Sequence, residues 1–178
     1  MDASFCGMMT TTYNCLAASE LDGCTSASCC TSITGCAYDA TEGCSVADDT
    51  YTTADYLSYL EDPKTTLYTA KSEACAAKSA TECASDATCD FQGQCGVDGV
   101  YLMIWLGNEC PTMANVLAKL FKEEGVTQAE IHEEANAAGI TVSPSFQAAL
   151  DAEGVSSDAA RISWAMSTVA AALLTVVV

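Results

Sequence analysis

The stretch "CAAKSATECASDATCDFQGQC", residues 75–95, decides how this chain is organised. Its four cysteines are separated by seven, five and five residues. A zinc or iron–sulfur site needs ligands two or three residues apart, often with histidines, because both must reach one ion at about 2.3 Å. The chain has no CxxC and a single histidine, His132, far from this stretch. We therefore expect disulfides here, and neither a metal nor another cofactor.

The complete set of cysteines favours the same interpretation, because its number is even and none is left over. Twelve thiols predict six disulfides, which form in oxidising compartments such as the cell exterior, a secretory lumen or the thylakoid lumen. The sequence leaves their connectivity open, although the four of residues 75–95 are expected to pair among themselves as a local module. The predicted disulfide residues are Cys6, Cys15, Cys24, Cys29, Cys30, Cys36, Cys44, Cys75, Cys83, Cys89, Cys95 and Cys110.

Charge limits the choice of partner. The chain has 24 acidic residues against 6 lysines and arginines, and the first 63 residues contain neither lysine nor arginine. Nucleic acid is excluded, because a nucleic-acid binder needs a basic surface to neutralise phosphates. We expect a solvated acidic surface with weak, diffuse cation binding, since no EF-hand loop of the D-x-D-x-D-G type marks a specific calcium site.

The sequence also contains an internal repeat. Residues 30–46, "CTSITGCAYDATEGCSV", align with residues 83–97, "CASDATCDFQGQCGV". Both follow the pattern C-x5-C-x-aromatic, a short loop and C-x-V, with Tyr38 and Phe91 at the aromatic position. The pattern indicates a duplicated disulfide module in which the ring supplies the small core that the disulfides enclose. A chance match between two cysteine-rich segments is the alternative.

Beyond Cys110 the apolar residues change to helical spacing. Thr127 and Glu130 form a capping-box pattern, and Ser143 followed by Pro144 is typical of a helix start. These signals predict three short amphipathic helices that pack against one another. The helices are expected to begin at Pro111, Thr127 and Ser143 and to end near Gly125, Gly139 and Gly154.

The motifs of common enzyme classes are missing from the sequence. "HEEAN" around His132 is not HExxH, and neither G-x-S-x-G nor a glycine-rich phosphate loop is present. Paired carboxylates are available for a glycosidase-type site, but a chain this small has little structure with which to build a cleft. We therefore expect no enzymatic activity and interpret His132 as a solvent-facing helix residue.

The last segment, residues 162–178, contains no charge. As a helix it would span ~25 Å, slightly less than the ~30 Å hydrocarbon core of a bilayer. We expect a retained transmembrane helix, with Arg161 among the headgroups and Trp164 at the interface. The alternatives are a cleaved lipid-anchor signal and a buried C-terminal helix. The apolar span includes Ala170, Ala171 and Ala172, which permit close approach of a partner helix, and Leu174.

The beginning, "MDASFCGMMTTTYNC", lacks the basic and apolar regions of a signal peptide. Because the cysteines require an oxidising compartment, we expect that a leader has been removed from, or is missing in, this sequence.

Together these patterns predict small disulfide-rich modules, with little regular structure and short helices, followed by a mainly α-helical region that ends in a hydrophobic transmembrane helix. The predicted divisions are 1–110 as a cysteine-rich acidic ectodomain, with module copies at about 24–62 and 75–110, then 111–155 as the helical region and 162–178 as the membrane segment.

We expect a non-catalytic structural or accessory subunit of a membrane-associated assembly, with its disulfide-stapled domain on the lumenal or extracellular side and other proteins as partners. One alternative is a lipid-anchored, GPI-type surface protein that binds a small ligand, a cation or a matrix component. The other is a small secreted hydrolase.

Overall fold

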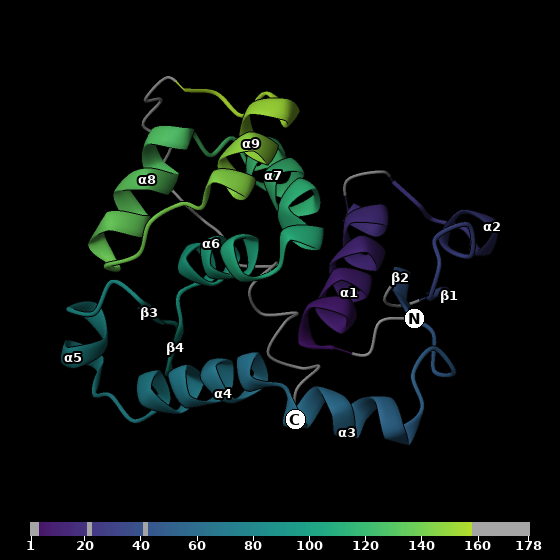
Figure 1. Ribbon diagram of the computed structural model, residues 1–178, viewed down its shortest axis with the longest axis horizontal. Coiled ribbons are helices and arrows are strands. Elements are labelled where there is room, and N and C mark those ends of the chain that lie inside the picture. The colour runs from purple at the N-terminus through teal and green to yellow at the C-terminus, as the bar shows by residue number, and fades with distance from the viewer. Residues whose placement is uncertain (1–3, 21–22, 41–42, 158–178) are drawn as a thin grey trace.

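A computed structural model describes residues 4–20, 23–40 and 43–157 of the chain (Figure 1). In chain order the elements are α1 (Phe5–Glu20), α2 (Ala27–Cys30), β1 (Cys36–Asp39), β2 (Gly43–Val46), α3 (Thr53–Glu61), α4 (Pro63–Ala76), α5 (Ala80–Ala84), β3 (Cys89–Phe91), β4 (Cys95–Val97), α6 (Gly99–Glu109), the 3-10 helix η1 (Pro111–Met113), α7 (Ala114–Glu123), α8 (Gln128–Ala137) and α9 (Pro144–Glu153). The prediction of a disulfide-rich fold with short elements is confirmed. The expectation of little regular structure before Cys110 is wrong, because α1 has 16 residues and α4 has 14.

Helix α1 forms in spite of a run of three threonines, whose branched side chains disfavour helices. The hydroxyl groups of Thr10, Thr11 and Thr12 each donate a hydrogen bond to the carbonyl oxygen four residues earlier, at 2.6, 3.1 and 3.1 Å. These bonds satisfy the side chains within the helix itself. The disulfides of Cys6 and Cys15 then attach both halves of α1 to other parts of the chain.

Helices α3 and α4 run almost end to end along one edge of the molecule (Figure 1). Asp62 lies at their junction, where its Oδ1 accepts a hydrogen bond from the backbone N–H of Lys64 at 2.9 Å and caps α4. Its other carboxylate oxygen accepts one from the backbone N–H of Phe5, also at 2.9 Å. One side chain therefore fixes the start of α4 against the start of α1.

The C-terminal helices begin and end close to their predicted positions. Thr127 caps α8 in a capping box with Glu130, and the Ser143 hydroxyl accepts a hydrogen bond from the backbone N–H of Phe146 at the start of α9. The predicted stops lie just beyond α7, α8 and α9 and have positive φ angles, which glycine adopts without strain; they are Gly125, Gly139 and Gly154.

A single hydrophobic core joins the two sides of the predicted boundary at Cys110. Phe5 and Tyr59 belong to the same buried cluster as Phe121 and Phe146. In Figure 1, α6 lies between α4 and the group formed by α7, α8 and α9. Contact is close there, because a Cβ atom added to Gly107 of α6 would lie 2.7 Å from the Phe146 ring. The regions 1–110 and 111–155 therefore share a core.

The twelve cysteines are joined in six disulfides, in agreement with the predicted number. The four cysteines of residues 75–95 pair among themselves, as expected. The pairs are Cys6–Cys110, Cys15–Cys36, Cys24–Cys29, Cys30–Cys44, Cys75–Cys89 and Cys83–Cys95.

The two antiparallel hairpins, β1–β2 and β3–β4, correct the prediction about their aromatic residues. Tyr38 is paired with Cys44 and is 37% exposed, and Phe91 is paired with Cys95 and is 45% exposed. The small cores beside the hairpins consist largely of the cysteines themselves, so that the disulfides occupy the space that the rings were expected to fill.

The predicted membrane segment, with Arg161, Trp164, Ala170, Ala171, Ala172 and Leu174, lies outside the described residues. Within residues 4–20, 23–40 and 43–157, no helix combines the length and the apolar character that a membrane crossing requires.

Candidate functional site

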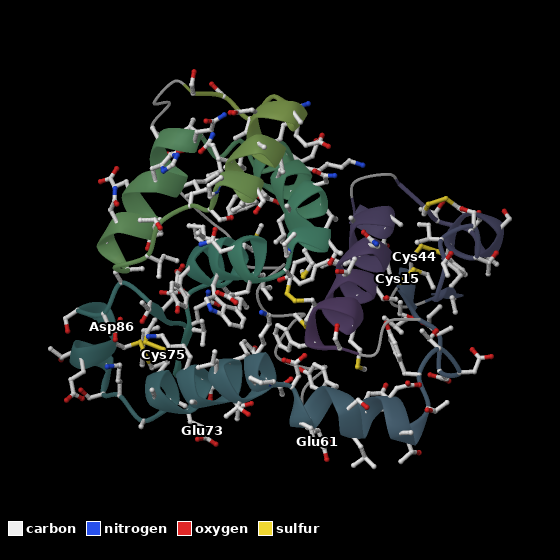
Figure 2. The ribbon with its side chains drawn as sticks, in the orientation of Figure 1. Cys15, Cys44, Glu61, Glu73, Cys75 and Asp86 are labelled. Atoms are coloured by element: carbon white, nitrogen blue, oxygen red, sulfur yellow. A yellow bond between two sulfur atoms is a disulfide. The ribbon has the colours of Figure 1, made fainter. Side chains whose placement is uncertain are left out.

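Each of the two hairpins is part of a larger unit with the same plan. In the first hairpin unit, residues 15–46, a helix carrying Cys15 is followed by a short helix and the hairpin; in the second, residues 75–97, the corresponding helix carries Cys75. Each unit has one disulfide from the long helix to the first strand and one from the short helix to the second strand. The two units lie on opposite sides of the molecule. Figure 2 shows Cys15 and Cys44 of the first unit on one side and Cys75 of the second unit on the other.

The helices α3 and α4 carry four of the six large hydrophobic side chains that are exposed among the described residues. On α3, Tyr56, Leu57 and Leu60 are 52, 56 and 62% exposed, and on α4 Leu67 is 59% exposed. We call these four residues the α3–α4 face. Scattered exposed leucines are common on proteins, but a group on two consecutive helices is typical of an interaction surface. Burial of each side chain by a partner would contribute about 1.5–3 kcal/mol.

Acidic side chains lie on the same two helices as this face. Asp55 lies on the same helix and forms a capping box with Thr52. Figure 2 shows that the side chains of Glu61 and Glu73 project from α3 and α4 away from the rest of the molecule. The two helices that carry the face therefore also carry exposed acidic side chains, which favours a partner whose own apolar surface is flanked by basic residues.

A groove of about 360 Å³ lies beside the same helices, between α4, β4 and α6. Its walls include Leu67 and Tyr68 of α4 and Leu102 and Trp105 of α6. The Trp105 ring also contacts the buried Phe5 ring edge to face, with centroids 5.7 Å apart. The groove is thus backed by the hydrophobic core, and its volume falls in the range of small-molecule sites in proteins.

One charged residue, Lys71, lies among the nine that line the groove. Its ammonium group lies 5.4 Å from the centroid of the Tyr101 ring, a cation–π contact. The lysines seven residues before and after it in the sequence are paired with carboxylates: Lys64 Nζ, at the start of α4, lies 3.0 Å from Glu109, and Lys78 Nζ, just beyond the end of α4, lies 3.1 Å from Asp86. Among the described residues, Lys71 has no such partner.

Two phenol groups line the groove together with this lysine. Burial raises the pKa of Tyr68, and burial together with the nearby Asp86 carboxylate raises the pKa of Tyr101. Both hydroxyl groups therefore keep their protons at neutral pH and are available as hydrogen-bond donors.

A pair of carboxyl groups with raised pKa values lies outside the groove. Burial, followed by the charge of Asp90, raises the pKa of Asp98, although its hydrogen bond from the backbone N–H of Tyr101 at 2.8 Å opposes this. Burial and the charge of Asp98 raise the pKa of Glu134. Asp98 caps α6, which gives it a structural role.

His132 is exposed on α8, where it was predicted. Its Nε2 lies 2.8 Å from the side-chain oxygen of Gln147, so its partner is an amide rather than a nucleophile. Every cysteine is in a disulfide. In the part of the chain that the structure describes, no three histidine, cysteine, aspartate or glutamate side chains are grouped as metal ligands.

Sequence reasoning identified the cysteines but not the α3–α4 face or the groove. The available signal for the face was the spacing of Tyr56, Leu57 and Leu60 in "TADYLSYLE", which places three large apolar residues on one side of a helix. The groove joins residues of two helices and a strand that are distant in the sequence, and no local pattern marks it.

Comparison with known proteins provides no relative from which a function can be transferred: no protein-family model, no curated protein and no solved structure matches this chain.

Proposed function

We propose that this chain is a non-catalytic docking subunit that acts in an oxidising compartment and binds a partner protein through the α3–α4 face. The observation that carries the proposal is the exposure of Tyr56, Leu57, Leu60 and Leu67, each more than half accessible to solvent. The six disulfides support the extracellular or lumenal location. The uncharged segment 162–178 supports attachment of the assembly to a membrane.

The partner's surface should be apolar and flanked by lysine or arginine. A chain with a net charge of −18 repels acidic proteins, and Glu61 and Glu73 place part of that charge beside the face. The disulfides and the shared core hold α3 and α4 in place before binding, which lowers the ordering cost of association.

The test is the native mass of the protein extracted from its source in mild detergent. The unmodified chain should elute as a complex of fixed stoichiometry. The variant Leu57→Asp/Leu60→Asp should elute as the free subunit, because two carboxylates would have to be desolvated in the interface.

Ser145→Asp/Ala148→Asp is the matched control, because it places the same charges at the same spacing on exposed positions of α9. The proposal fails if the unmodified chain is free, or if the α3 variant remains in the complex while its disulfides and circular dichroism are unchanged.

The groove favours a second function, the binding of a small ligand. It has the volume and the mainly apolar walls of a ligand site, with few polar groups.

A further inference from the structure

We propose that the groove between α4 and α6 binds an amphipathic monocarboxylate, an apolar chain or ring system that carries one carboxylate, with Lys71 as the headgroup contact. This inference goes beyond the docking subunit proposed above, and the two sites share only Leu67, which belongs to the α3–α4 face and borders the groove.

The apolar part of the ligand follows from the walls. Leu102 is buried, Trp105 is backed by the Phe5 ring, and Leu67 borders the groove with 59% of its surface exposed. The alanines Ala70 and Ala74 leave the α4 side open because their side chains are small. A volume of about 360 Å³ admits about twelve groups the size of a water molecule, at ~30 Å³ each. This corresponds to a body of about ten to twelve carbon atoms.

The charge of the ligand follows from the lysines of α4. Lys64 and Lys78 are each neutralised by a carboxylate of the protein, whereas Lys71 is in contact with the Tyr101 ring instead. Lys71 is the one charged residue among the described residues that line the groove. The Asp86 carboxylate acts on both Lys71 and Tyr101, but it is already paired with Lys78 at 3.1 Å, so this group of charges still favours an anion over a cation. A carboxylate ligand would give Lys71 the kind of partner that Lys64 and Lys78 already have.

The polar groups that line the groove suit the same ligand. The hydroxyl groups of Tyr68 and Tyr101 have no hydrogen-bond partner among the described residues, and both rings line the groove. A carboxylate has two acceptor oxygens, so it can accept from the ammonium group and from a phenol at once. A neutral amphiphile can use the phenols but gains nothing from the charge.

The experiment uses dodecanoate as probe and the full chain with Trp164→Phe, which leaves Trp105 as the only tryptophan. Titration below the micelle concentration, followed by Trp105 emission and by calorimetry, should give one site with a Kd of roughly tens of micromolar for a ligand of this size. Dodecyltrimethylammonium, with the opposite charge, should bind at least about tenfold more weakly.

Two variants locate the site. Lys71→Met keeps an apolar side chain of similar length and should weaken dodecanoate binding about five- to tenfold while leaving dodecanol binding unchanged. Ala74→Phe, at an exposed position that folding tolerates, should fill the groove and abolish binding of all three amphiphiles. Lys122→Met on α7 is the control for the loss of one exposed lysine and should change nothing.

Several results would overturn the proposal. Equal binding of the anionic and cationic amphiphiles, or an unchanged dodecanoate affinity in Lys71→Met, would show that charge is not recognised. Absence of any dodecanoate binding would show that the groove is not a site for an amphipathic carboxylate. The docking proposal is tested separately, since Leu57→Asp/Leu60→Asp should leave dodecanoate binding unchanged.

Discussion

The first and second hairpin units share a frame but hold the short helix in different ways. In both units the backbone N–H of the short-helix cysteine, Cys30 or Cys83, donates to the carbonyl of a serine, Ser26 or Ser79. The two hairpins pair in the same register, with an aromatic residue opposite the second-strand cysteine. This agreement extends the internal repeat found in the sequence, with the first unit reaching back to Cys15, before the predicted module boundary near residue 24.

The difference lies in the residues around the serine. In the second unit, Ser79 and Glu82 form a capping box. In the first unit Ser26 makes no side-chain cap, and Cys29, which occupies the position equivalent to Glu82, forms a disulfide with Cys24. The same turn is therefore closed by hydrogen bonds in one unit and by a covalent bond in the other.

The largest expected effect tests the disulfide from the long helix to the first strand, which both units share. Cys15→Ala/Cys36→Ala and Cys75→Ala/Cys89→Ala remove equivalent disulfides, whose sequence separations are 21 and 14. Each should lower the free energy of unfolding by about 3 kcal/mol, because chain entropy depends only weakly on loop length. Guanidinium denaturation followed by circular dichroism measures both. A cost below about 1 kcal/mol for only one of them would show that the units are not equivalent.

A smaller effect is expected when the Cys24–Cys29 disulfide of the first unit is replaced by a capping box like that of the second unit. Cys24→Ala/Cys29→Ala should destabilise the protein by about 2 kcal/mol, since the loop is short. Cys24→Ala/Cys29→Glu creates the Ser-x-x-Glu capping pattern of the second unit, with Ser26 already extended at φ −142° and ψ 151°. It should recover about 0.5–1 kcal/mol through a new capping box. Equal denaturation midpoints for Cys24→Ala/Cys29→Ala and Cys24→Ala/Cys29→Glu would contradict the equivalence of Cys29 and Glu82.

The serines themselves provide a matched pair. Ser79→Ala should cost about 1 kcal/mol, because the helix loses a hydrogen bond to its exposed N–H groups. Ser26→Ala should cost only a few tenths of that amount, since Ser26 makes no side-chain cap. Thermal unfolding of both variants in the same buffer measures the two costs. Similar losses of stability at Ser26 and Ser79 would contradict the conclusion that only Ser79 caps its helix.

The smallest effect concerns pH. Hydrogen bonds from Ser79 lower the pKa of Glu82, and hydrogen bonds from Thr88 lower the pKa of Asp86. Such groups stabilise the fold above their ordinary pKa near 4, and the contribution is lost as the pH falls through their folded values. The first unit has Cys29 and Ile33 at these positions.

Amide exchange at Thr88, corrected for intrinsic rates, should therefore accelerate as the pH falls below about 4, and most strongly well below about 3, relative to exchange at Cys36 in the first unit. Parallel acceleration in both units would point to a global loss of stability instead.

Local chemistry made the C-terminal helices predictable. Thr127 and Ser143 mark their starts because a cap depends on residues within one turn. The pairing within residues 75–95 was predictable for the same reason, since the partners lie within one short segment.

The rest of the fold depends on contacts between residues that are distant in the sequence. Cys6 pairs with Cys110 across most of the chain, and no spacing rule indicates this. The threonine-rich α1 is held by its packing and disulfides more than by its propensity. The prediction that Tyr38 and Phe91 supply the small cores is wrong because the disulfide cysteines already fill the interior beside the hairpins.

The Cys6–Cys110 bond closes most of the described chain into a covalent ring. Every other disulfide lies wholly on one side of the segment between Cys44 and Cys75. A protease that cuts once in that segment, for example after Lys64, would therefore produce two polypeptides held together by a single bond. Such a cleaved form would run as one band on a non-reducing gel and as two after reduction, so a single cut in this segment would leave the size of the protein on a native or non-reducing gel almost unchanged.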